Sequence, residues 1–102
     1  MRQPHFVLIG PYEFDIEYTE RLVDDDQKLN GRILYDDARI DVENNVSDQC
    51  KRTTVVHEIL HGCSTFSNAG LTEEQVELMA YQVTEVLQRN PQLFDMFKDG
   101  VK

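Results

Sequence analysis

The chain has 102 residues, of which 40% are hydrophobic, and a formal net charge of −9. This length suits one domain, so we expect a single domain spanning residues 1–102. An acidic surface repels phosphate groups, which argues against a nucleic-acid-binding protein and against docking on anionic membranes. No apolar run approaches the ~20 residues of a membrane span, and the apolar run 6–9 is too short for a signal peptide. We therefore expect a cytoplasmic protein.

The first 43 residues show the two-residue periodicity of β-strands with one buried and one solvated face. It is clearest in residues 12–18, where apolar and acidic side chains alternate. The predicted strands are 6–9, 12–18, 31–35 and 39–43. Gly10-Pro11 predicts a tight turn and hence an N-terminal hairpin, and Asp36-Asp37 predicts a second turn. We interpret residues 20–27 as a solvated linker or one short helical turn.

The remainder of the chain is predicted to be helical. Ser47 or Asp48 can cap a helix that runs through His61, and Gly62 is a natural end or kink point for it. Thr72 and Gln75 fit a capping box, so a second helix should start at Thr72. Its apolar stripe continues to residue 89.

A short third helix is expected after Asn90-Pro91, burying Leu93, Phe94 and Phe97. Strands first and helices afterwards indicate an α+β fold. We expect a small antiparallel or mixed sheet packed on the first helix, which is followed by a helix rich in glutamate.

The five residues His57-Glu58-Ile59-Leu60-His61 spell the motif HExxH. Positions i and i+4 share one helix face, so His57 and His61 can bind one metal ion. Glu58 is placed to act as a general base on a metal-bound water. Shuffling this composition yields the motif in roughly one trial in 200, so its surroundings must support it.

A catalytic zinc site needs a third protein ligand. His5 is the only other histidine, and Ser64 and Ser67 occupy positions where a metzincin has Gly and His. The acidic candidates all belong to the second helix: Glu73, Glu74 and Glu77. Glu77 lies at the edge of the apolar stripe, inside the helix, and is preferred. Glu73 is the first alternative. It is less favoured as a ligand because an acid in the first helical turn is ordinarily explained by its stabilising effect on the helix dipole.

Two cysteines, Cys50 and Cys63, are predicted to be free thiols. On one helix, 13 residues separate them by roughly 20 Å, which is too far for a disulfide.

With its HEILH motif and Glu77, the chain resembles the zincin-like metallopeptidases, especially the minimal gluzincins and the ImmA/IrrE-like group. Short members of that group, often encoded by phages or prophages, are the most similar. The resemblance rests on Thr53–Gly62, on Val76–Ala80 and on Asn90–Leu93, and it covers residues 31 to 95. It implies His57, His61 and Glu77 as zinc ligands and Glu58 as the general base.

By this resemblance the protein hydrolyses peptide bonds with a zinc-activated water. A peptide or protein substrate would pair with Arg39–Glu43 as an edge strand. Tyr12, Tyr18, Tyr35 and Tyr81 are candidates for a second group that stabilises the reacting oxygen. The alternative is a zinc-stabilised, non-catalytic module that binds a peptide or regulates a partner. Closure of the metal site by Cys50 or Cys63 would favour this alternative.

Overall fold

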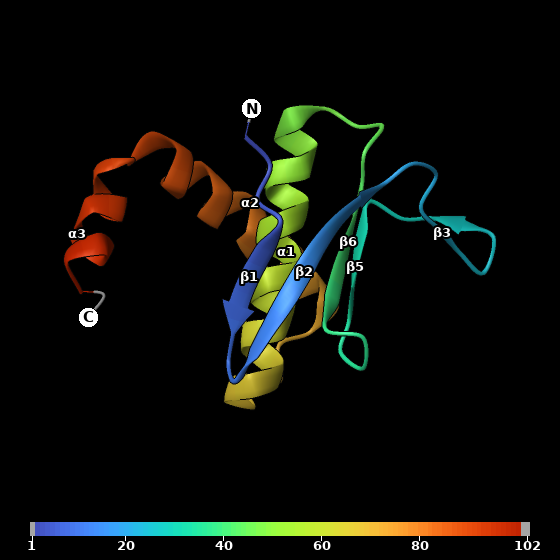
Figure 1. Ribbon diagram of the computed structural model, residues 1–102, viewed down its shortest axis with the longest axis horizontal. Coiled ribbons are helices and arrows are strands. Elements are labelled where there is room, and N and C mark those ends of the chain that lie inside the picture. The colour runs from blue at the N-terminus through green and yellow to red at the C-terminus, as the bar shows by residue number, and fades with distance from the viewer. Residues whose placement is uncertain (1, 101–102) are drawn as a thin grey trace.

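The structure, a computed structural model, describes residues 2–100, with side chains from 2 to 98 (Figure 1). It has an α+β fold in which a four-stranded mixed sheet packs on one helix and two further helices follow, as predicted. The strands are β1 Phe6–Ile9, β2 Tyr12–Thr19, β3 Val23–Asp24, β4 Gln27–Lys28, β5 Gly31–Leu34 and β6 Arg39–Glu43. The helices are α1 Asp48–Ser67, α2 Glu73–Arg89 and α3 Gln92–Gly100.

The four-stranded sheet has the order β1-β2-β6-β5. β1 and β2 form the predicted antiparallel hairpin, and β5 and β6 form a second one. The hairpins are joined by parallel pairing of β2 with β6, in which Ile16 lies opposite Ile40. The prediction that Arg39–Glu43 is an edge strand is therefore wrong. β6 has a partner on both sides, and the free edges belong to β1 and β5.

The hydrophobic core lies between this sheet and α1, which crosses behind the strands in Figure 1. Alternation in β2 turns Phe14 and Ile16 inward while their acidic neighbours face solvent. The buried core residues are Ile9, Phe14, Ile16, Ile40 and Val42. Val55 and Ile59 of α1 pack against them. One helix face is thereby fixed against the sheet, and this sets the direction of its other side chains.

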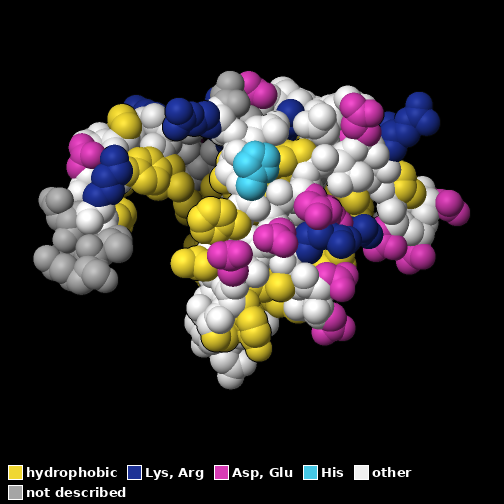
Figure 2. Space-filling view, in the orientation of Figure 1, with side chains coloured by type: hydrophobic (Ala, Val, Ile, Leu, Met, Phe, Trp, Pro, Cys, Tyr) yellow, Lys and Arg dark blue, Asp and Glu magenta, His cyan; other side chains and the backbone are white. Residues whose placement is uncertain are grey.

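The opposite face of the sheet is charged (Figure 2). Asp41 is 2% exposed and accepts hydrogen bonds of 2.8 Å from Nε of Arg32 and from Nε of Arg39. Arg32 lies directly across the strand pair and Arg39 two residues away on the same face. The hydrogen bond and the charge of Asp41 raise the pKa of Arg39 above its ordinary value. This cluster ties β5 to β6.

Helix α1 begins as predicted and ends later. The Oγ of Ser47 accepts a hydrogen bond of 3.1 Å from the Cys50 amide, which makes Ser47 the N-cap. Gly62 was predicted as a natural end or kink point, but the helix continues through it to Ser67. Asn68, with φ 59°, is the C-cap. Gly62 makes room for packing instead, because a Cβ there would lie 3.0 Å from Cδ1 of Ile9.

The segment predicted to be a linker or helical turn forms a small hairpin from β3 and β4. Asp25 and Asp26, at its tip, have φ of 50° and 63°. A two-residue turn of type I′ requires positive φ at both central residues, and Asp tolerates this conformation. The acidic run therefore closes a hairpin.

The two C-terminal helices differ in how well they are packed. The capping box of Thr72 and Gln75 is present, and Val76 and Ala80 of α2 are fully buried. α3 forms as predicted, but it stands away from the sheet (Figure 1), and Phe94 and Phe97 are 49% and 63% exposed. The predicted burial of these two aromatics is thus wrong. None of the described helices is long and apolar enough to cross a membrane.

Candidate metal-binding site

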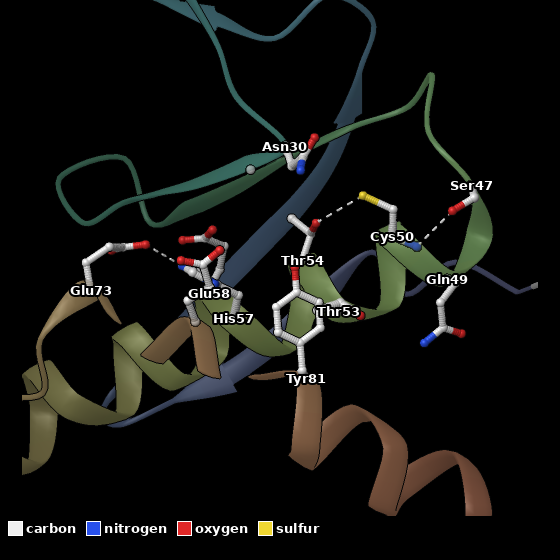
Figure 3. Close-up of a pocket in the computed structure, with 12 residues that line it drawn as sticks. Asn30, Ser47, Gln49, Cys50, Thr53, Thr54, His57, Glu58, Glu73 and Tyr81 are labelled. Carbon is white, nitrogen blue, oxygen red and sulfur yellow. Dashed lines mark hydrogen bonds and ion pairs between the residues drawn. The ribbon is translucent and has the colours of Figure 1, made fainter. Parts of the chain in front are cut away.

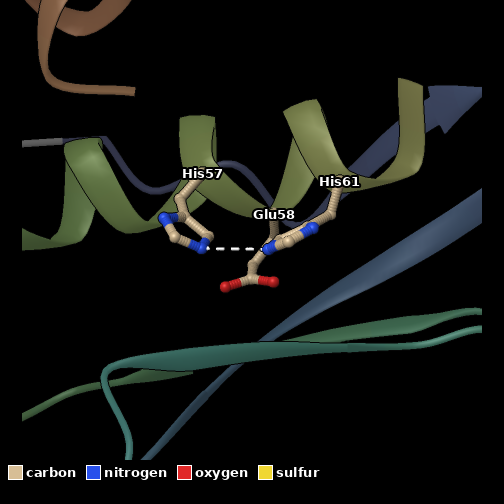
Figure 4. A group of neighbouring side chains, drawn as sticks. All are labelled: His57, Glu58 and His61. Atoms are coloured by element: carbon tan, nitrogen blue, oxygen red, sulfur yellow. Dashed lines mark hydrogen bonds between the residues drawn. The ribbon is translucent and has the colours of Figure 1, made fainter. Parts of the chain in front are cut away.

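His57, Glu58 and His61 form a candidate metal-binding group on α1 (Figure 4). The two imidazoles project from successive turns, and their Nε2 atoms lie 3.1 Å apart. One ligand atom from each of the three residues lies within 4.8 Å of the other two. The four-residue spacing of the histidines therefore has the consequence expected from helix geometry.

Glu73, the first residue of α2, reaches the same point. The chain turns back after α1 through residues 68–72, and this places the start of α2 beside the histidines. The Glu73 carboxylate lies 2.8 Å from Nε2 of His57 and 2.7 Å from Nε2 of His61. Two imidazole nitrogens and one carboxylate thus converge from two helices.

The donor set has the composition and spacing that can hold a metal ion. Three short contacts join the two Nε2 atoms and the Glu73 carboxylate, yet each Nε2 carries at most one proton. If both nitrogens donate to Glu73, the contact of 3.1 Å between the two Nε2 atoms is left without a hydrogen bond. Ligands at about 2.0–2.1 Å from a tetrahedral zinc lie roughly 3.3 Å apart, and the observed separations of 2.7, 2.8 and 3.1 Å are a few tenths of an ångström shorter. A cation among the three groups would satisfy all of them.

Among the predicted acidic ligands, Glu73 and not Glu77 contacts the histidines. Glu77 lies one turn further along α2 and lines the same pocket, with no described hydrogen bond or ion pair to either imidazole. Glu74 is exposed and outside the pocket lining. The helical wheel of α2 puts residues 73 and 77 on one face, and both line the pocket. It could not tell which turn of that face meets the histidines.

Glu58 projects from α1 towards β5 and lines the same pocket as Glu73 and Glu77. It is 5% exposed, and its Oε2 would be 3.3 Å from a Cβ built on Gly31 of β5. Burial, and secondarily the charge of Glu73, raises the pKa of Glu58 to about 7. A carboxyl group with such a pKa exchanges protons near neutral pH. Glu58 is therefore a nearly buried carboxyl group that borders the pocket beside the histidines.

A pocket of about 450 Å³ extends from these residues along α1 towards its N-terminus (Figure 3). Asn30 and Gly31 form one wall, and Tyr81 points into it from α2. The other predicted tyrosines are outside this lining, and the hydroxyls of Tyr18 and Tyr35 bond to Pro4 O and Thr65 Oγ1. Asn30 and Gly31 were not predicted as site residues, because nothing local in the sequence shows that β5 lies over α1.

Both cysteines are free, as predicted. Cys63 is exposed, and Cys50 lines the pocket with its Sγ 4.0 Å from Thr54 Oγ1. Neither cysteine joins the candidate metal-binding group found among the described residues. The group thus has no cysteine that would close it.

No protein-family model, curated protein or solved structure matches this chain.

Proposed function

We propose that the protein is a zinc-dependent metallopeptidase, with His57, His61 and Glu73 as zinc ligands and Glu58 as the general base. The observation that carries this proposal is the convergence of the Glu73 carboxylate on both imidazoles, at 2.7 and 2.8 Å, beside a buried glutamate. Glu73 takes the place of Glu77, the ligand preferred from the sequence.

We propose zinc as the metal for this set of donors. Two imidazoles and one carboxylate are the protein ligands of a common class of catalytic zinc site, which keeps its fourth position for water. Bound zinc would supply a water with pKa near ~7 and would polarise the scissile carbonyl. A purely structural site usually has four protein ligands, and no cysteine joins this group among the described residues. This favours the enzyme over the non-catalytic, zinc-stabilised module.

Glu58 would act as the general base that accepts a proton from the attacking water. Its carboxylate is near the imidazole ligand atoms but makes no hydrogen bond or ion pair with them in the described interactions. It therefore remains free to take a proton from the attacking water and to pass it to the leaving amine. His57, His61 and Glu73 would supply the three protein ligands of a catalytic zinc site, so Glu58 is not needed as a fourth ligand.

The substrate would be a peptide that adds to the free edge of β5. The amide of Glu43 donates to Asn30 O at 2.7 Å, so Asn30 faces β6. Antiparallel pairing alternates, and the backbone groups of Gly31 and Ile33 consequently point away from β6. They can pair with an extended peptide beside the pocket. β5 thus takes the role that the sequence suggested for Arg39–Glu43.

The test compares Glu58→Gln with Glu85→Gln, a change at an exposed glutamate that pairs with Arg89 on the far part of α2. Both variants should retain zinc. Digestion of a peptide library, followed by mass spectrometry, should show cleavage by the wild type and by Glu85→Gln. Zinc-loaded Glu58→Gln should lose at least about 100-fold in rate, the scale of a general-base contribution. Equal cleavage by zinc-loaded Glu58→Gln would refute this role.

A further inference from the structure

A second, smaller pocket of about 180 Å³ is built from the N-terminal arm, β2 and the first turns of α1. Its lining shares no residue with the pocket beside the histidines. It consists of Arg2, Pro4, Tyr18, Lys51, Arg52 and Val55. Three of these side chains are cationic and none is acidic, although the chain has a net charge of −9.

Lys51 is the most unusual of these residues. It is 9% exposed, among the buried residues of α1. No carboxylate oxygen of the described residues lies within 4.0 Å of its ammonium group, and no described hydrogen bond uses that group. None of the fully buried side-chain nitrogen or oxygen atoms of the described residues lacks a hydrogen-bond partner, so the ammonium group keeps solvent contact while the aliphatic part of Lys51 is buried. The ammonium group is therefore available to pair with an anion that enters the pocket.

The two arginines reinforce this argument. Arg2 forms no ion pair among the described residues, and Arg52 bonds only to the uncharged Gln49, at 3.3 Å. Elsewhere in the chain, Arg32, Arg39, Arg89 and Lys98 all pair with carboxylates. Five cations have no ion pair among the described residues, and three of them line this pocket, whereas Arg21 and Lys28 lie elsewhere.

The remaining walls are apolar. Pro4, Val55 and the ring of Tyr18 face the cavity, and the Tyr18 hydroxyl donates to Pro4 O at 2.8 Å, which holds the N-terminal arm against β2. Burial raises the pKa of Tyr18, so its hydroxyl stays neutral and adds no competing negative charge. The volume is below the roughly 300–1,000 Å³ of pockets for drug-sized ligands. It suits a single charged group on a short apolar body.

We propose that this pocket binds an anionic group, a carboxylate or a phosphate carried on a small apolar moiety. Lys51 is its principal charge partner, Arg2 and Arg52 contact it from the rim, and Pro4, Val55 and Tyr18 enclose the apolar part. The site is separate from the metal-binding group and does not depend on peptidase activity.

The test titrates metal-free protein with hexanoate and with inorganic phosphate, followed by amide NMR shifts. Removing metal with a chelator prevents either anion from binding at the histidines. We expect saturable shifts at residues 2, 3, 5, 18 and 51–55. Tighter binding of hexanoate would identify a carboxylate on an apolar body, and tighter binding of phosphate would identify a phosphate site.

Lys51→Met keeps the aliphatic part of the side chain and should weaken binding about tenfold or more, as expected for loss of a charge-assisted hydrogen bond. Lys28→Met, at an exposed lysine of β4, is the matched control and should bind as the wild type does. Arg52→Gln should also weaken binding, and it tests the site if Lys51→Met does not fold. No saturable shift for either anion, or equal affinities in all variants, would overturn the proposal.

Discussion

Gly31 of the edge strand β5 lies directly over the Glu58 carboxylate of α1, so that a Cβ on Gly31 would be 3.3 Å from Glu58 Oε2. The same Cβ would clash with Cγ2 of Thr54 and would lie 3.0 Å from the carbonyl oxygen of Asp41. The absence of a side chain at this position lets the sheet approach the helix closely. This approach buries Glu58 and brings the free edge of β5 to the pocket.

Gly31→Ala should therefore destabilise the protein. Overpacking a site of this kind costs about 1–3 kcal/mol, and the fully buried backbone of β6 cannot move easily. For a domain of this size, each kcal/mol lowers Tm by roughly 4–8 °C, which thermal unfolding can measure.

A second change distinguishes this clash from a general effect of Ala. Thr54→Ser removes Cγ2 and keeps the hydroxyl, so Gly31→Ala combined with Thr54→Ser should recover part of the lost stability. If the double variant is as unstable as the sum of both single changes, close packing of Gly31 on Thr54 is not the cause.

Asp41 should contribute far more than Glu17 to the stability of the fold, although both carboxylates are within ion-pair distance of Arg39. Asp41 Oδ1 is 2.8 Å from Arg39 Nε, and its side chain is 3% exposed, whereas Glu17 is 3.8 Å away and 59% exposed. Asp41→Asn should cost about 1.5–3 kcal/mol, because it weakens charge-assisted hydrogen bonds with two arginines. Glu17→Gln should change stability by less than about 0.5 kcal/mol. Urea unfolding of both variants measures this contrast, and equal losses would contradict it.

The environment of the Glu43 carboxylate should make the stability of the protein depend on pH. Backbone amides of Asn45, Leu22 and Arg21 donate to its carboxylate, the first two at 2.9 and 2.7 Å, and they lower its pKa from the ordinary value of 4.5. A lowered pKa stabilises the folded state above pH 4.5, and this contribution is lost as the pH falls through the folded value.

Glu43→Gln, which does not titrate, should consequently be less stable than the wild type at pH 7. The difference in unfolding free energy should shrink as the pH is lowered below 4.5. Urea unfolding across this range measures it. A difference that stays constant with pH would show that the charge of Glu43 contributes nothing.

Features encoded by neighbouring residues could be predicted from the sequence. The alternation in β2, the Ser47 cap, the capping box of Thr72 and the convergence of His57 and His61 all follow from local geometry. The motif therefore located the candidate metal-binding group before any tertiary contact was known.

Features that depend on pairing between distant segments could not be predicted from the sequence. The parallel alignment of β2 with β6 puts Arg39–Glu43 in the sheet interior, and no local pattern encodes it. Gly62 resembles a helix end in sequence, but its role comes from contact with Ile9. The choice between Glu73 and Glu77 depends likewise on how α2 lies along α1.

The central claim is that Glu73 completes a zinc site with His57 and His61. The most direct measurement is zinc content by elemental analysis of untagged wild type, Glu73→Gln and Glu77→Gln after equilibration in the same dilute zinc buffer. We predict about one zinc per chain for the wild type and for Glu77→Gln, since loss of one exposed charge changes affinity by no more than about fivefold. Glu73→Gln should retain less than about a tenth of that amount, since losing a ligand costs more than the roughly 10–100-fold of an outer-shell partner. Zinc lost from Glu77→Gln but kept by Glu73→Gln, or absent from the wild type, would contradict the account.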